Sequence, residues 1–277
     1  IGMLEWSSVG WGLGTWALGL SSLACAQRRL IFRRPTHIRS LPAGPWAGSF
    51  DIEPLAFEVE PGVRLQGWRS RPHGAEVRGT LLHFGGRGEH VAWAPHMSSW
   101  LRDWSVLTFN YRGFGSSTGR PGEAEVMRDA LAIHARFMAP LGAAHPLVVV
   151  GRSLGSAVAV RTAQQVQPRA LVLFSPLSSV RSLVRRQPLL APASGLLRHP
   201  MDALAHASGV RCPALVLLAA QDRQIPHTHS HRLAGALGGS TLVREIAGTQ
   251  HRTLPRSAAA QQAIVAFFTR EGLLPGG

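Results

Sequence analysis

Short apolar stretches alternate with segments of helical periodicity from about residue 50 to the end of the chain. The first two stretches flank Pro61-Gly62, a dipeptide typical of a hairpin turn. Residues 123–138 carry apolar side chains at helical spacing and acidic residues in their first turn, which suit the positive end of a helix dipole. We predict strands over residues 55–60, 63–70, 80–84, 105–110, 147–151, 170–174, 214–219 and 241–246, and helices over 91–101, 123–138, 155–167, 227–237 and 257–270.

A hairpin followed by repeated strand–helix units is typical of an α/β fold with a mostly parallel eight-stranded sheet and helices on both faces. The repeat is interrupted at residues 176–209, a stretch rich in Pro, Ser, Leu and Arg that contains no predicted strand. We interpret this stretch as a small helical cap, inserted into a single α/β domain over residues 35–277. Residues 35–50 contain several prolines and glycines and are interpreted as the linker before the strands.

The composition excludes some classes of protein. Of the 277 residues, 45% are hydrophobic, which is enough for a large buried core. The formal charge is +14, yet the basic residues are spread along the chain and no nucleic-acid-binding motif is present, so we expect no nucleic-acid partner. Cys25 and Cys212 are the only cysteines, too few for a disulfide framework or a cysteine metal site.

The N-terminal segment, residues 1–34, differs in composition from the rest. Residues 9–26 hold no charge, and tryptophans at positions 6, 11 and 16 suit a membrane interface. Four arginines follow at once, at positions 28, 29, 33 and 34. We expect an uncleaved anchor in a bacterial inner membrane, with a cleaved signal (or lipoprotein signal) and a soluble helix as alternatives. The positive-inside rule would place the α/β domain in the cytoplasm, although its side of the membrane stays open.

The pentapeptide Gly151-Arg152-Ser153-Leu154-Gly155 carries the strongest chemical signal. It follows the apolar run 146–150 and precedes a stretch rich in Ala and Val. A buried strand, a sharp turn with one serine and then a helix is the context of a nucleophile elbow. The flanking glycines leave room for neighbouring backbone. Ser153 is therefore the candidate nucleophile, and a merely tight turn is the alternative.

A serine nucleophile needs a base, and the base needs an orienting acid. Asp222 follows the predicted strand 214–219, and His251 follows the strand 241–246, so both should lie at the sheet edge that bears Ser153. His251 is also the only histidine after residue 231. Asp202, in the cap, is a weaker candidate for the acid, and Asp222 could instead cap the helix 227–237.

An oxyanion requires two aimed N–H groups. The amide of Leu154, directly after the nucleophile, is the first candidate. The second should come from the Gly-rich loop after strand 80–84, where we assign Arg87, with Gly86 as the runner-up. A phosphate cradle is the other interpretation of this loop, but no Walker or dinucleotide-binding motif follows.

Three histidines alternate at the start of the helix 227–237. His227 and His231 are four residues apart and could bind a metal from one helix face, yet no third ligand is evident nearby. A solvated helix face is the favoured interpretation of His227, His229 and His231. We expect no metal and no organic cofactor.

These motifs together resemble the α/β-hydrolase superfamily. The resemblance rests on Asn110-Tyr111-Arg112-Gly113-Phe114-Gly115-Ser116-Ser117-Thr118-Gly119, the elbow, the Asp222 loop with Ile225-Pro226, and His251. The chain looks most like the bacterial membrane-anchored, small-cap serine hydrolases, relatives of the eukaryotic depalmitoylating thioesterases. It departs from many of them at Phe84-Gly85-Gly86-Arg87, where they carry His-Gly-Asn, and Arg87 places a cation at the pocket mouth.

The resemblance implies a serine hydrolase of carboxylic esters or thioesters, in which Ser153 forms an acyl-enzyme, His251 moves the proton and Asp222 orients the imidazole. A serine peptidase acting on short peptides and a non-catalytic interaction protein at the membrane are the alternatives. The predicted cap mixes leucines with Arg181, Arg185, Arg186 and Arg198, so we expect a small-molecule or lipid-like acyl substrate with an anionic portion.

Overall fold

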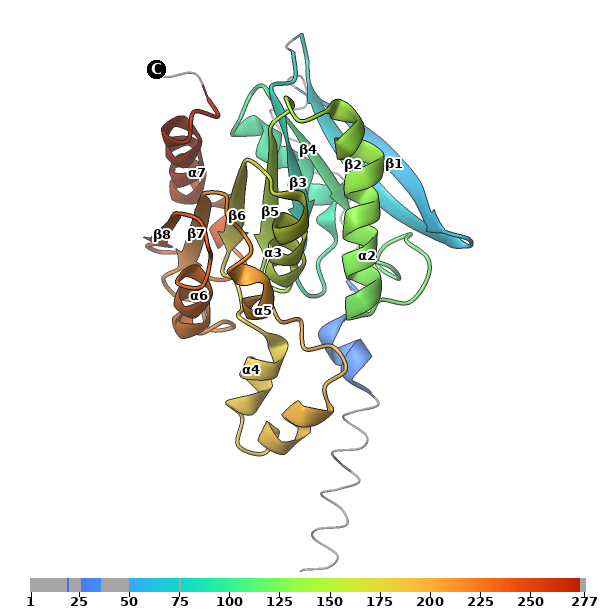
Figure 1. The fold of residues 1–277 in the computed structure, drawn as a ribbon, viewed down its shortest axis with the longest axis vertical. Coiled ribbons are helices and arrows are strands. Elements are labelled where there is room, and N and C mark those ends of the chain that lie inside the picture. Colours follow the sequence, from blue (N-terminus) through green and yellow to red (C-terminus); the bar gives the residue numbers. More distant parts are fainter. Residues whose placement is uncertain (1–18, 20–25, 36–49, 75, 275–277) are drawn as a thin grey trace, which may run out of the picture.

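Eight strands form one sheet at the centre of the protein (Figure 1), in the order β1-β2-β4-β3-β5-β6-β7-β8. The computed structural model describes residues 19, 26–35, 50–74 and 76–274. β1 and β2 pair antiparallel, as do β2 and β4, and every other pairing is parallel. This confirms the predicted mostly parallel sheet. The strands are β1 (Phe50–Glu60), β2 (Val63–Pro72), β3 (Gly79–Phe84), β4 (Trp104–Phe109), β5 (Leu147–Arg152), β6 (Ala170–Phe174), β7 (Ala214–Ala219) and β8 (Thr241–Ile246).

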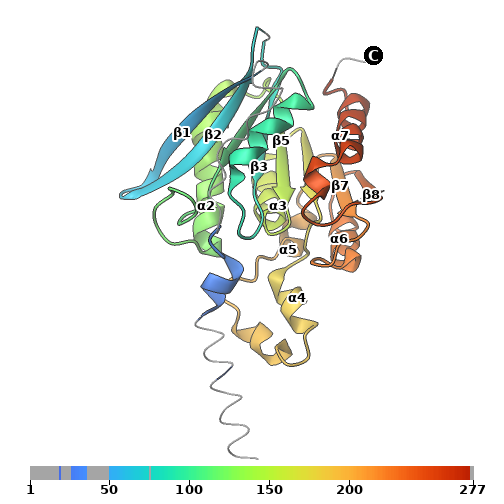
Figure 2. The ribbon, with the colours of Figure 1, turned by 180° about the vertical axis from the view of Figure 1, so that it is seen from behind.

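Helices cover both faces of the sheet (Figures 1 and 2). The apolar sides of α2 (Glu123–Ile133), α3 (Gly155–Val166) and α6 (His227–Ala234) join one buried cluster with side chains from the strands. On the opposite face, η1 (Val91–Ser99) and α7 (Ala258–Arg270) join the other large cluster. The five central strands are almost wholly buried because both of their faces are covered, which explains the continuous apolar runs of β6 and β7.

Besides the predicted helix 227–237, which ends at Ala234, two predicted helices differ in detail from the structure. The predicted helix 91–101 is a 3-10 helix that ends at Ser99 and contains Pro95, which has no N–H for a regular helical ladder. The predicted helix 123–138 is α-helical only to Ile133 and then continues as a π-helix, η2 (His134–Met138), followed by η3 (Ala139–Leu141). Neither difference moves a candidate site residue.

The segment between β6 and β7 contains three short helices, α4 (Val180–Arg185), η4 (Ala191–Leu196) and α5 (Leu204–Ala207). It includes residues 176–209, the predicted cap, and extends beyond the sheet beside the helical residues 26–31 (Figures 1 and 2). The Gln27 side chain donates to the Leu196 carbonyl and accepts from the Arg198 amide, so the helical N-terminal residues pack against this segment.

The predicted membrane anchor, residues 9–26, lies almost entirely outside the described residues. Within the ranges that the structure describes, no helix is both long enough and apolar enough to cross a membrane. The anchor therefore stays a prediction.

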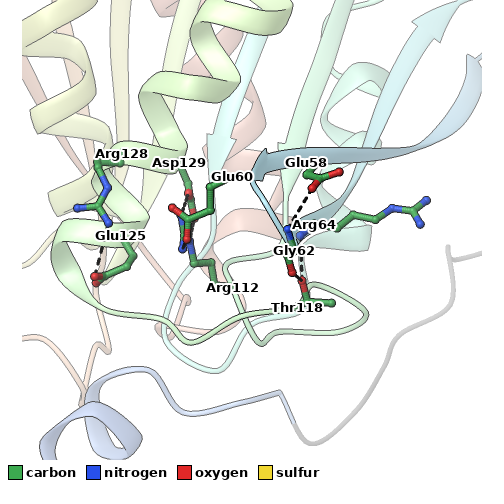
Figure 3. Close-up of polar contacts among 9 residues, drawn as sticks. All are labelled: Glu58, Glu60, Gly62, Arg64, Arg112, Thr118, Glu125, Arg128 and Asp129. Atoms are coloured by element: carbon green, nitrogen blue, oxygen red, sulfur yellow. Dashed lines mark hydrogen bonds and ion pairs between the residues drawn. The ribbon is translucent and has the colours of Figure 1, made fainter.

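A buried ion pair fixes the loop after β4 to α2. Arg112 donates to both carboxylate oxygens of Asp129, at 2.7 Å each, and also contacts Glu60 at the end of β1 (Figure 3). The side chains of Arg112 and Asp129 are each 5% exposed. Loss of Asp129 would remove two charge-assisted hydrogen bonds from the buried Arg112 guanidinium and leave Glu60 as its remaining carboxylate partner.

Replacing Asp129 with alanine should therefore lower the free energy of unfolding by about 3 kcal/mol, the lower end of the range for breaking a buried pair, because Glu60 still faces Arg112. The matched control is Glu125→Ala on the same helix, which removes a 3.6 Å ion pair with the exposed Arg128 (Figure 3) and should cost less than about 1 kcal/mol. Urea denaturation followed by circular dichroism measures both. Equal losses for the two variants would contradict a special role for the buried pair.

Candidate active site

Ser153 lies at the sharp turn between β5 and α3, the predicted elbow. Its φ angle is +50°, in the left-handed region that is strained for any residue with a Cβ. Its amide is held by the Phe174 carbonyl, and it accepts from the Ser156 amide through its own carbonyl. The serine is thus fixed in a strained turn at the carboxyl end of a central strand, with the start of α3 directly behind it.

The two flanking glycines are required by close packing. A Cβ on Gly155 would overlap the carbonyl oxygens of Phe84 and Gly85, and a Cβ on Gly151 would lie 2.5 Å from the Cβ of Ala159. Contacts of this kind cannot form without moving the backbone, so β3, the elbow and α3 approach each other only because both positions lack side chains.

His251 and Asp222 meet at the same edge of the sheet. Asp222 follows β7 and His251 follows β8, and Nδ1 of His251 lies 2.7 Å from Oδ2 of Asp222. The side chains are 6% and 1% exposed respectively. The other oxygen of Asp222, Oδ1, accepts from the amides of Gln224 and Ile225, so the carboxylate orientation is fixed from both sides.

The environment keeps Asp222 ionised. Burial by itself raises the pKa of Asp222, but the hydrogen bonds from His251 and from the Ile225 amide outweigh it and lower the pKa to about 2. A carboxylate can only accept a hydrogen bond, so Nδ1 of His251 carries the proton toward Asp222 and Nε2 is left unprotonated in the neutral ring.

Two of the three candidate oxyanion amides have no partner. Among the described residues, the amides of Leu154 and Arg87 donate no hydrogen bond, whereas the Gly86 amide donates to Oε2 of Glu89 at 2.5 Å. The runner-up, Gly86, is therefore already engaged. The side chain of Arg87 is held by a 2.6 Å bond from its Nε to the Leu30 carbonyl.

A buried ion pair that the sequence analysis missed connects three loops of the site. Glu89 pairs with Arg152 at 2.8 Å and also accepts from Gly86 and from Nε1 of Trp93. Arg152 in turn donates to the carbonyl of His251. Burial raises the pKa of Glu89, but the charge of Arg152 and the bond from Gly86 lower it to about 2. The pair joins the Gly-rich loop, the elbow and the histidine loop.

Ser153 and His251 line the same cleft, which has a volume of about 650 Å³. Asp222 is not part of the lining and reaches the cleft only through His251. Besides the elbow, the cleft is lined by the histidine loop with Pro255 and Arg256 of η5 (Leu254–Arg256), the Gly-rich loop, residues 33 and 34, Trp93 and Gln224. The structure thus brings the three predicted residues into one site.

The other polar candidates lie elsewhere. His229 is buried and bonds to Oγ of Ser178 at 2.8 Å, so the prediction of a wholly solvated face for the histidine trio is wrong at this position. His227 bonds to the Ala219 carbonyl. Asp202 accepts from the Ala205 amide at the start of α5. In the described ranges, no three His, Cys, Asp or Glu side chains are grouped to hold a metal ion.

Comparisons with known proteins show which family the chain belongs to. A family model described as serine aminopeptidase, S33, matches residues 75–193. An uncharacterized protein of Mycobacterium tuberculosis is 31% identical over 263 residues, which cover 90% of this chain and 89% of the relative. The chain is a member of the α/β-hydrolase superfamily. The resemblance inferred from its motifs is therefore confirmed, although its place in the membrane-anchored branch is not.

Two further hydrolases show the breadth of the likeness. The fold of an esterase from Pyrococcus furiosus superposes with a TM-score of 0.63 at 19% identity, covering 86% of this chain and 98% of the esterase. A lysophosphatidylserine lipase of Danio rerio is 30% identical over 141 residues, 44% of this chain and 36% of the lipase. As a member of this superfamily, the chain is assigned as a hydrolase.

Proposed function

We propose that this α/β-hydrolase cleaves carboxylic esters or thioesters through a serine nucleophile and an acyl-enzyme. One observation carries the proposal: the hydrogen bond between Asp222 and Nδ1 of His251 at the cleft where Ser153 lies on its elbow. This arrangement supplies a nucleophile, a base with a defined tautomer and an acid that stays ionised.

The proposed reaction begins when Nε2 of His251 takes the hydroxyl proton of Ser153 as its oxygen attacks the carbonyl carbon. The imidazolium formed is stabilised by the Asp222 carboxylate and then protonates the leaving oxygen or sulfur. Water attacks the acyl-enzyme with His251 again acting as the base. Each step uses groups that lie at one edge of the sheet.

The negative charge on the carbonyl oxygen would be bound by two amides. Leu154 is the first of them, because its N–H lies at the start of α3, where the helix dipole also favours negative charge. Arg87 is the better second donor, since the Gly86 N–H is engaged by Glu89. We therefore keep Arg87 in the proposed oxyanion hole in preference to Gly86.

The ester proposal and the peptidase alternative predict different substrate panels. Purified protein should hydrolyse p-nitrophenyl and thioester acyl substrates with kcat/KM at least tenfold above that for aminoacyl p-nitroanilides. The reason is that an amine is a poorer leaving group and must be protonated by His251 as it departs. Absorbance assays under matched conditions measure both. The family model named for a serine aminopeptidase makes this control necessary, and faster amide cleavage would overturn the ester assignment.

Membrane attachment is a separate proposal. It is supported by the uncharged stretch 9–26 and by the arginines that follow it, which would put the catalytic domain at the cytoplasmic face of a bacterial inner membrane. The residues concerned are mostly outside those described, and the catalytic proposal does not depend on them.

A further inference from the structure

Arginines from four separate segments line the cleft that holds Ser153. Arg33 and Arg34 come from the N-terminal residues, Arg87 from the Gly-rich loop and Arg252 from the residue after the candidate base. Arg152 and Arg256 also line the cleft, so six of its lining residues are arginines. The fraction of arginine among the lining residues is well above the fraction of arginine in the whole chain.

The acidic residues nearby do not balance these charges. Among the described residues that line the cleft, Glu89 is the only carboxylate, and it is paired with Arg152. Within the described ranges, Arg33, Arg34, Arg87 and Arg252 form no ion pair with a carboxylate. The cleft therefore carries an excess of positive charge beside the candidate nucleophile.

A hydrogen bond fixes the side chain of Arg87 close to another arginine. Its Nε–H donates to the Leu30 carbonyl, which places its guanidinium beside the segment that bears Arg33. Partial burial lowers the pKa of Arg87, and the charge of Arg33 lowers it further, which is the mark of two cations in close approach. A bound anion would remove this repulsion and would accept the remaining guanidinium hydrogens.

We propose that the cleft selects acyl substrates that carry an oxyanion, phosphate or carboxylate, close to the scissile bond, and that Arg33, Arg34, Arg87 and Arg252 bind it. The inference rests on the proposed ester hydrolase function, since it names the substrate class of the same site. The sequence suggested that the anionic portion would contact arginines of the cap. None of these cap arginines lines the cleft, so we assign the contact to the arginines that do; the cap residues are Arg181, Arg185, Arg186 and Arg198.

The test compares 1-acyl-glycerol-3-phosphate with 1-monoacylglycerol of the same chain length, both below their aggregation limits. Binding is measured by calorimetry on the full chain with Ser153→Ala, so the result does not depend on turnover. The phosphorylated lipid should bind at least about tenfold more tightly, and Arg33→Gln with Arg252→Gln should reduce this ratio to near one. On the protein with Ser153 intact, kcat/KM for fatty-acid release should follow the same ratio.

The matched control is Arg169→Gln with Arg211→Gln, which removes two charges just before β6 and β7, at the opposite edge of the sheet. This variant should keep the full preference. Equal binding of the two lipids, or equal losses from the cleft and control variants, would overturn the proposal. Selective binding without Ser153-dependent hydrolysis would instead contradict the proposed function and leave the anion site standing.

Inorganic phosphate separates a substrate-borne anion from a free one. It should compete weakly with the phosphorylated lipid, at millimolar concentrations, because it lacks the acyl chain. If phosphate alone binds as tightly as the phosphorylated lipid, the cleft is a site for free phosphate and the proposed substrate class is wrong.

Discussion

Ser153→Ala and Ser153→Gly should each reduce ester hydrolysis by at least about 10³-fold, because both remove the oxygen that attacks the substrate carbonyl. Any residual activity would come from binding and from the oxyanion amides alone. Initial rates with a p-nitrophenyl ester, measured with protein purified by the same protocol, provide the comparison.

The two variants should differ in stability. Ser153 has a φ of +50°, which costs about 1–2 kcal/mol for a residue with a Cβ and almost nothing for glycine. Ser153→Gly should therefore unfold at a higher urea concentration than Ser153→Ala, although glycine loses more chain entropy on folding. A Ser153→Gly variant that is less stable than Ser153→Ala would contradict the backbone strain inferred from the φ angle of Ser153.

Glu89→Ala should have the second largest effect, on stability and turnover together. The change leaves the Arg152 guanidinium buried without its carboxylate and releases the amide of Gly86 and the indole of Trp93. We expect a loss of about 3–5 kcal/mol in the free energy of unfolding. Since the pair joins the Gly-rich loop to the elbow, kcat should fall by about 10–100-fold with a smaller change in KM.

Two milder variants define what Glu89 does. Trp93→Phe removes only one donor and should cost less than Glu89→Ala in both measurements. Glu89→Gln keeps the shape of the side chain but presents an NH2 group toward donors that need an acceptor. Its losses of stability and kcat should therefore be larger than those of Trp93→Phe and smaller than those of Glu89→Ala. If Glu89→Ala changes stability but leaves kcat intact, the residue is structural and does not position the site.

The pH dependence of stability offers a second readout for Glu89. Its pKa in the folded protein is about 2, below the ordinary value of 4.5, so ionised Glu89 contributes stability that is complete above pH about 4.5. This contribution is lost as the pH falls through about 2. The stability advantage over Glu89→Gln should therefore shrink across this interval and stay constant above it.

The sheet could be predicted from the sequence because its central strands are buried on both faces. Strands β6, β7 and β8 have the predicted bounds, and β6 and β7 are short apolar runs, each buried along its whole length. The edge strand β1 begins five residues before its prediction, at Phe50, because a strand with one exposed face alternates polar and apolar residues and has no clear start.

The positions of Ser153, Asp222 and His251 follow from the same logic, as parallel strands present their carboxyl ends at one edge. The Glu89–Arg152 pair could not be found this way, because it joins residues 63 positions apart that belong to different loops. Its one sequence signal is an acidic residue three positions after Gly86, where a side chain can return to a loop amide. The arginine cluster was missed for a similar reason, since its members are scattered from residue 33 to residue 256.

The prediction that His229 is solvated was wrong because it relied on the alternation of the three histidines alone. The three alternating histidines of α6 suggested a polar, solvated face, but residues 229, 230 and 233 form the side of the helix that faces the protein. A histidine can occupy such a position when a hydroxyl, here that of Ser178, satisfies its ring nitrogen.

The central claim is that Ser153 is the nucleophile of this hydrolase. Its most direct test is to treat the folded protein with a fluorophosphonate and to locate the adduct by peptide mass spectrometry. We predict one phosphonylated residue, Ser153, with labelling lost in Ser153→Ala and strongly slowed in His251→Ala. A folded protein that hydrolyses esters but carries no adduct on Ser153, or carries it on another serine, would contradict the account.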